Sequence, residues 1–173
     1  MKVGQTTRAM IVLVAVAALA VSAVAVAKTV KGNGKDNLLE GTSSKDRIIG
    51  KGGDDRIFGG DGADRVSAGP GDDLVQAEDG NDTAKGAAGD DSLSTGPGKD
   101  TIKGGGGEDT ITGDDQNDRI DGGNGIDDLE GGDGDDVITA AGDGSADEVQ
   151  CGQGNDRAVV DAGDSTLDCE RIE

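Results

Sequence analysis

Aliphatic residues recur every nine positions along residues 50–139, and each lies between two mostly polar neighbours. They are Ile57, Val66, Val75, Ala84, Leu93, Ile102, Ile111, Ile120, Leu129 and Ile138. In a three-residue strand the central side chain points to one face and its neighbours to the other. The pattern therefore predicts very short strands with one inward residue each, joined by six-residue turns.

An aspartate stands two residues before each of these aliphatics, at the sixth position of a nine-residue unit. The units that start at Gly59, Gly104, Gly122 and Gly131 read G-G-x-G-x-D-x-U-x, where U is aliphatic. Glycine adopts the positive φ angles of tight turns and leaves backbone carbonyls open to a ligand. Two units would form one coil with a strand on each side, so aspartates eighteen residues apart would stack.

The composition excludes an ordinary globular core. The chain of 173 residues has 33 glycines, one aromatic residue (Phe58) and a formal net charge of −20. Such a chain stays disordered unless cations compensate its charge. We find no basic patch interleaved with aromatics, so we expect no nucleic-acid partner, and the negative charge also disfavours anionic membrane surfaces.

Residues 1–27 are predicted to form a helical secretory signal peptide. Lys2 and Arg8 precede a long apolar stretch that ends in small residues, with cleavage after Ala23, Ala25 or Ala27. We therefore expect a secreted, extracellular protein that does not touch the membrane after cleavage. The alternative is an uncleaved N-terminal helix that anchors the protein outside the membrane, because the stretch approaches the ~20 residues that span a bilayer.

Residues 28–159 are predicted to form the repeat domain, with irregular units at both ends. The first unit, residues 31–39, places Asp36 at the sixth position. In the next, residues 40–49, Ser43 and Ser44 replace glycines, so we expect that turn to bind metal poorly. Residues 140–150 form a stretched unit of eleven residues that keeps Asp147 in phase.

Residues 160–173 break the period and are expected to cap the last coil, because an array must cover its open end. Val160, Leu167 and Ile172 are candidates to close the core there. The chain has two cysteines, Cys151 and Cys169, and in an exported protein they are expected to form a disulfide. Two free thiols would instead require a reducing compartment.

Stacked carboxylates repel one another, so the turns are expected to bind several Ca²⁺ ions, a hard cation with 6–8 oxygen ligands. The chain has no histidine, and the cysteines are expected to pair, which disfavours zinc and copper. Ala77 and Gln116 replace glycines in turns of one edge of the solenoid, so we expect the other edge, through Asp55, Asp73, Asp91, Asp109 and Asp127, to hold the more regular row of ions. The candidate ligands are Asp36, Asp55, Asp73, Asp91, Asp109 and Asp127 at one edge, and Asp64, Asp82, Asp100, Asp118, Asp136 and Asp156 at the other.

The nonapeptides resemble the hemolysin-type calcium-binding (RTX) repeats of secreted bacterial proteins from Lys31 to Val159. The resemblance implies a parallel β-roll in which the sixth-position aspartates and loop carbonyls bind calcium. The expected fold class is therefore all-β, a right-handed β-helix or solenoid of about seven 18-residue coils.

We expect a non-catalytic calcium-binding protein that folds on binding Ca²⁺. An enzyme is not expected, because the chain lacks histidine, a G-x-S-x-G elbow, an H-E-x-x-H helix and a P-loop. The alternative is a surface adhesin or partner-binding module that uses the seventh and ninth positions against an unidentified surface or protein partner. The short threonine series at Thr83 and Thr101 gives this alternative little support.

Overall fold

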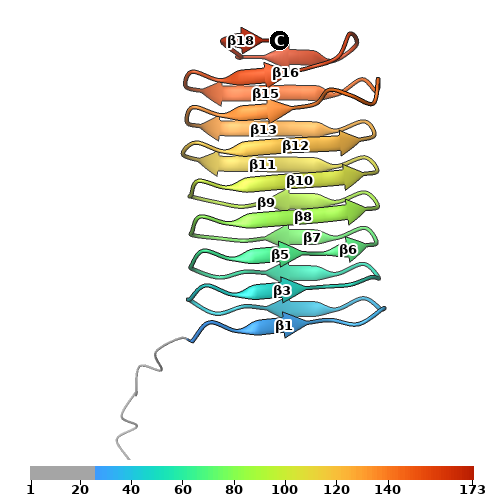
Figure 1. The fold of residues 1–173 in the computed structure, drawn as a ribbon, viewed down its shortest axis with the longest axis vertical. Helices are drawn as coiled ribbons and strands as arrows, with labels where there is room; N and C mark the ends of the chain where they lie inside the picture. The colour runs from blue at the N-terminus through green and yellow to red at the C-terminus, as the bar shows by residue number, and fades with distance from the viewer. Residues whose placement is uncertain (1–25) are drawn as a thin grey trace, which may run out of the picture.

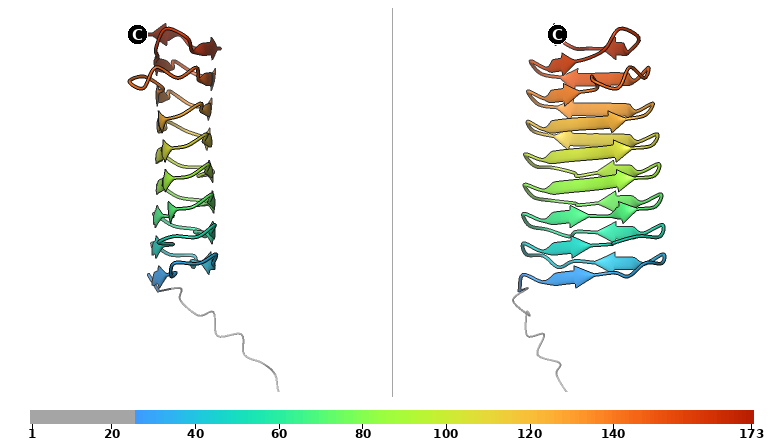
Figure 2. Two further views of the ribbon diagram at one scale, coloured as in Figure 1. Left: turned by 90° about the vertical axis from the view of Figure 1, so that its right-hand side faces the viewer. Right: turned by 45° about the vertical axis from the view of Figure 1, so that its right-hand side comes forward.

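The computed structural model describes residues 26–173 as a solenoid built from 18 short β-strands. The chain winds in successive coils that stack along one axis (Figure 1). Seen from the side, the strands lie in two separate layers that the turns connect (Figure 2). The all-β parallel fold is confirmed, with about eight coils in place of the seven expected. The additional coil arises because β1 and the C-terminal cap both form paired strands outside the regular repeats.

Sheet 1 has ten strands. Its main path is β1 (Thr29–Lys31), β3 (Arg47–Ile49), β5 (Arg65–Ser67), β8 (Thr83–Ala88), β10 (Thr101–Gly106), β12 (Arg119–Asn124), β14 (Val137–Thr139), β16 (Arg157–Val159) and β18 (Arg171–Ile172), and β6 (Gly69–Pro70) pairs with β8.

Sheet 2 has eight strands. In space they follow the order β2 (Leu38–Glu40), β4 (Arg56–Phe58), β7 (Leu74–Gln76), β9 (Ser92–Ser94), β11 (Thr110–Asp115), β13 (Asp128–Asp133), β15 (Glu148–Gln153) and β17 (Ser165–Leu167). All strand pairs within both sheets are parallel, so each coil adds one strand to each sheet.

The inward aliphatics form one continuous core between the sheets. In sheet 1 Ile102 pairs with Ile120, eighteen residues later, and in sheet 2 Ile111 pairs with Leu129. These residues are at most 2% exposed. Because each strand has a single inward side chain, the core is one residue wide in each sheet, and stacking of the coils buries it.

The first unit has a register different from the expected one. Leu39, and not Leu38, is the inward residue of β2: it is 7% exposed, whereas Leu38 is 63% exposed. The sixth position of this unit is therefore Asn37, and Asp36 precedes it. The nonapeptide frame at the start of the array could not be fixed from sequence because Leu38 and Leu39 are both apolar.

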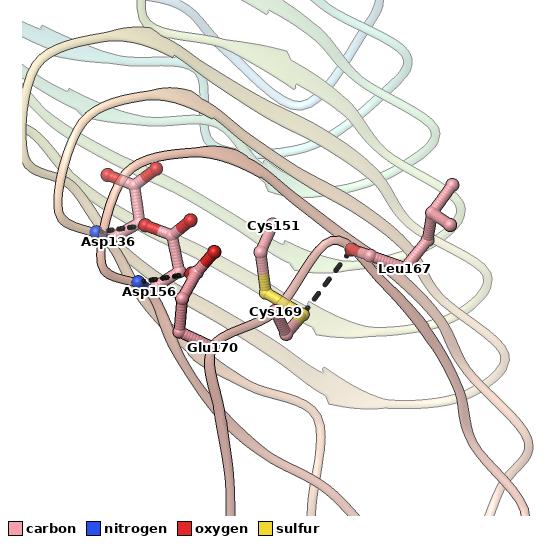
Figure 3. Close-up of a disulfide and its surroundings, with 6 residues drawn as sticks. All are labelled: Asp136, Cys151, Asp156, Leu167, Cys169 and Glu170. Carbon is pink, nitrogen blue, oxygen red and sulfur yellow. Dashed lines mark hydrogen bonds between the residues drawn. A yellow bond between two sulfur atoms is a disulfide. The ribbon is translucent and has the colours of Figure 1, made fainter.

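The C-terminal segment closes the solenoid mainly with its backbone and a disulfide. Cys151 at the start of the last regular unit is bonded to Cys169, as expected (Figure 3). Val160 packs against the core. The expected role of Leu167 and Ile172 is wrong, since they are 57% and 56% exposed. In β17 the residue paired with Val149 is Thr166, which leaves Leu167 at an outward position.

The predicted signal peptide, residues 1–27, lies outside the described residues except for its last two. Within residues 26–173, the structure has no helix with the length and hydrophobicity needed to cross a bilayer. Cleavage and secretion therefore stay predictions.

Glycine at the fourth position of a turn lets neighbouring coils approach closely, which gives a first prediction. Gly107 has a φ of 133°, and a Cβ on it would lie 2.1 Å from the carbonyl oxygen of Gly89. Gly142 has a φ of 119°, but a Cβ there would meet nothing within 4 Å. We expect Gly142→Ala to lower the free energy of unfolding by about 1–3 kcal/mol through backbone strain. Gly107→Ala should lower it further, because the coils must also move apart.

Urea denaturation of both variants in calcium buffer measures this difference. Equal midpoints for Gly107→Ala and Gly142→Ala would show that close contact between coils does not require the glycine.

Candidate metal sites

The sixth-position aspartates are buried in two rows, one at each edge of the solenoid. Every member is at most 3% exposed. The first row leads into the strands of sheet 2 and contains Asp55, Asp73, Asp91, Asp109, Asp127 and Asp147. The second row leads into the strands of sheet 1 and contains Asp46, Asp64, Asp82, Asp100, Asp118, Asp136 and Asp156.

One carboxylate oxygen of each aspartate in the rows joins two coils. The backbone N–H of Asp55 donates to Oδ1 of Asp73, and that of Asp73 donates to Oδ1 of Asp91. Bonds between successive aspartates of both rows measure 2.6–3.0 Å. Each row is therefore a ladder in which one side chain holds the turn of the preceding coil.

The other oxygen, Oδ2, is buried without a hydrogen-bond partner in twelve of these aspartates. They are Asp55, Asp64, Asp73, Asp82, Asp91, Asp100, Asp109, Asp118, Asp127, Asp136, Asp147 and Asp156. Leaving a buried charged acceptor unpaired is costly in free energy. A cation beside the Oδ2 atoms would remove this repeated cost.

Backbone carbonyl oxygens lie beside the unpaired carboxylate oxygens. A Cβ placed on Gly104 would be 2.2 Å from Oδ2 of Asp109 and 2.5 Å from the carbonyl oxygen of Gly122, one coil further on. The same arrangement recurs at Gly131, beside Oδ2 of Asp136 and the carbonyl oxygen of Cys151. Carboxylate and carbonyl oxygens together are the ligands that calcium takes.

Side chains alone do not form a metal cluster in residues 26–173. No three histidine, cysteine, aspartate or glutamate side chains gather there around one point. A cation in these turns would therefore be held by aspartate oxygens together with backbone carbonyls, and the residues fit an oxygen-liganded ion such as Ca²⁺.

Burial raises the pKa of the twelve aspartates whose Oδ2 has no partner. The pKa rises to about 7 for Asp82, Asp91 and Asp118, first through desolvation and then through repulsion by neighbouring aspartates. The hydrogen bond from the preceding backbone N–H opposes this rise. Without a cation, ionisation of these carboxylates near neutral pH therefore destabilises the fold.

Eleven of the twelve aspartates expected to bind metal lie in the two rows, with the expected spacing between coils. The exception is Asp36, which is exposed. Its Oδ1 accepts the N–H of Asp54 at 3.0 Å, in an outer ladder at the fifth position. Asn37 takes the sixth position, and its N–H donates to Oδ1 of Asp55 at 2.8 Å.

Asp147 is a row member that the candidate set omitted. It follows the stretched loop 140–150, yet the N–H of Asp127 donates to its Oδ1 at 2.9 Å and its Oδ2 has no partner. Its place two residues before Val149 was the available signal. Asp147 is in phase with the repeat, but the candidate set leaves it out because its longer turn lacks the usual glycine spacing.

Asp46 differs from the other members of its row. Its Oδ2 accepts the N–H of Thr42 at 2.5 Å and the hydroxyl of Thr42 at 2.9 Å. The serine-rich turn thus satisfies its own carboxylate. This geometry agrees with the expectation that the turn binds metal poorly, which stays a prediction.

Non-glycine residues at positive φ occur beside both rows. Lys51 and Ala87 lie in turns of the first row, and Glu78, Asp114 and Gln116 lie in turns of the second. The fourth-position substitution, Gln116, has a φ of 79°. Strained turns thus occur in both rows and do not set the second row apart. Stronger ion binding along the first row stays a prediction.

Comparison with known protein families identifies one match. The model of the RTX calcium-binding nonapeptide repeat (4 copies) matches residues 31–66, 40–75, 67–102, 76–111, 94–129 and 112–144. Together these overlapping matches cover residues 31–144, about two thirds of the chain. A comparison with curated proteins finds no match.

The contrast between Asp64 and Asp46 gives a second prediction. Asp64→Asn keeps an Oδ1 that can accept the N–H of Asp46 but replaces the unpaired Oδ2 with an amide nitrogen, which cannot bind a cation. We expect calorimetry to show fewer bound calcium ions for Asp64→Asn. Asp46→Asn should keep the wild-type ion number, even though it loses the bonds from Thr42 and is less stable. The assignment is wrong if both variants lose the same number of ions.

The raised pKa values give a third prediction, for the calcium-free chain. Since the folded pKa values of Asp82, Asp91 and Asp118 are about 7 and an unfolded aspartate has a pKa of ~3.9, the protonated state favours folding. Their contribution to stability is complete below about pH 4 and is lost as the pH rises through 7. Without calcium, the β signal in circular dichroism should be stronger at pH 5 than at pH 8. A stronger calcium-free β signal at pH 8 would contradict the electrostatic account.

Proposed function

Because the chain belongs to the RTX calcium-binding nonapeptide repeat family, we propose that it is a secreted, non-catalytic protein that folds when calcium ions occupy its turns. The observation that carries the proposal is the set of twelve buried Oδ2 atoms without a hydrogen-bond partner. Their number and regular placement support several ions per chain, distributed along both rows.

The residues that would hold the ions are the twelve aspartates with an unpaired Oδ2, together with turn carbonyls. Bound calcium supplies positive charge and coordination to oxygens of neighbouring coils. The aspartates meanwhile hold the turn backbone through Oδ1, and the glycines keep carbonyl oxygens close to Oδ2. Binding free energy therefore favours the stacked state over the unfolded chain.

Two features support an extracellular site of action. The Cys151–Cys169 disulfide is typical of oxidising compartments. The predicted signal peptide, residues 1–27, would direct the chain there. An uncleaved N-terminal helix would place the same repeat domain outside the cell as a membrane-anchored protein.

The chemistry of the rows supports a binding role without catalysis. The aspartates repeat the same surroundings along each row, whereas an acid and base pair needs two carboxyl groups in different environments. The chain also has no histidine. We therefore propose a structural role for the carboxylates.

Calcium titration tests the proposal and is the fourth prediction. In chelator-treated buffer at pH 8, we expect weak β signal in circular dichroism and a large gain on adding Ca²⁺. Calorimetry should give several ions per chain, with affinity at about 10⁻⁴–10⁻³ M. Mg²⁺ should induce little structure, since it demands a tighter octahedral geometry. A calcium-free spectrum equal to the calcium-loaded one would show that folding is independent of the ion.

A further inference from the structure

The outer face of sheet 1 is basic, although the chain is strongly acidic as a whole. Its outward residues on β1 to β12 include six cationic side chains and a single acidic one, Asp121. The cationic residues, which we call the basic face, are Lys31, Arg47, Arg65, Lys85, Lys103 and Arg119.

The outer face of sheet 2 has the opposite character. Its outward residues on β2 to β13 include one cationic side chain, Arg56, and the acidic residues Glu40, Asp128 and Glu130. Successive nonapeptides contribute their strands alternately to sheet 1 and sheet 2. Residues at the same position of the repeat therefore lie on both sheets, and most of the cationic ones lie on sheet 1.

Most charges of the basic face have no ion-pair partner within residues 26–173. Lys103 pairs with Asp121, and the other ion pair in residues 26–173 joins Arg157 to Glu173. Arg47 and Arg65 are register partners on adjacent strands. Like charges side by side in a sheet are destabilising. An anion bound between them would remove that cost.

The basic side chains line two separate pockets on this face, which follow one another along the solenoid axis and which together we call the groove. One stretch lies over Ile48 and Val66 and is lined by Arg47, Arg65 and Lys85. A second stretch on the same face is lined by Lys103 and Arg119, among others. Successive strands lie about 4.8 Å apart, so the cations are spaced along the solenoid axis like charges along an extended polymer.

The surroundings of the groove favour a thin, thread-like ligand. Exposed acidic residues occupy both edges, Asp54 and Asp72 in turns of the first row and Asp61 and Asp79 in turns of the second. A flat anionic membrane would approach these acids as well as the cations. A single polymer chain along the groove would avoid the acids at both edges and would meet one acidic side chain, Asp121, which is paired with Lys103.

The chemistry of the face also distinguishes between polymers. Phe58, the one aromatic residue, lies on sheet 2, so sheet 1 has no ring on which nucleic-acid bases could stack. Guanidinium groups bind carboxylates through paired hydrogen bonds. The neighbouring hydroxyls of Thr83 and Thr101 suit a hydroxyl-rich chain. We infer that the basic face of sheet 1 binds a linear polysaccharide that carries carboxylate groups.

The fifth prediction tests this site on the folded, calcium-loaded protein, with hyaluronan as the uronate-bearing probe and dextran as its neutral counterpart. We expect binding of hyaluronan that weakens with added salt, and no binding of dextran. The variant Arg47→Gln/Arg65→Gln should lower the affinity on the order of tenfold. The matched control is Arg56→Gln, which removes an exposed seventh-position arginine from sheet 2 and should keep the affinity of the wild type.

Three results would overturn the inference. They are absence of hyaluronan binding, equal loss of affinity in the sheet 1 and sheet 2 variants, and tighter binding of oligothymidylate or phosphatidylserine vesicles than of hyaluronan. Light scattering of the free protein tests whether a second copy covers the face. If the free protein is a dimer and Arg47→Gln/Arg65→Gln dissociates it, the basic face is a self-association surface and not a polysaccharide site.

The inference goes beyond calcium binding and can fail separately from it. Circular dichroism of the same samples reports whether calcium is needed for the fold. A chain that folds without calcium would overturn the proposed function, whereas the comparison of Arg47→Gln/Arg65→Gln with Arg56→Gln would still decide the polysaccharide site.

Discussion

The solenoid depends on placing side chains of the same kind above one another at the strand spacing of about 4.8 Å. For the aliphatics this repetition is favourable, because each coil buries the inward residue of the next. For the sixth-position aspartates the same repetition brings like charges together in a buried setting. The period that forms the core thus also creates the electrostatic cost. A cation beside the Oδ2 atoms would relieve that cost without changing the period.

Groups of the C-terminal cap terminate both aspartate rows, and Lys28 terminates the second row at its start. At the start, the N–H of Lys28 donates to Oδ1 of Asp46. At the end, Oε2 of Glu170 accepts the N–H of Asp156 at 2.9 Å, and Oδ1 of Asp164 accepts that of Asp147 at 3.1 Å (Figure 3 shows the former). The cap therefore supplies acceptors where the next coil would have supplied aspartates. The disulfide of Cys169 fixes this segment to the last regular unit.

The sequence predicts the fold well where the nine-residue period is unbroken. From Asp55 to Asp136 each sixth-position residue lies in its expected row, because the strand, turn and coil lengths all follow from one repeat. The errors fall where the period changes. Adjacent leucines obscured the frame around Asp36, and the stretched loop concealed the role of Asp147. At the cap, exposed Leu167 shows that hydrophobicity alone does not identify the inward residue when no repeat sets the phase.

The basic face was not apparent from the sequence for a related reason. The formal charge of −20 includes thirteen buried aspartates, whose charge lies in the turns and not on the sheet faces. The remaining charges acquire a spatial arrangement only when alternate repeats are assigned to opposite sheets. Arg47 and Arg65 then become neighbours, whereas Arg56, between them in sequence, lies on the other side of the molecule. In a two-sided solenoid the 18-residue coil therefore decides which charged residues share a face. The charge that a ligand meets on that face cannot be predicted from the net charge of the chain.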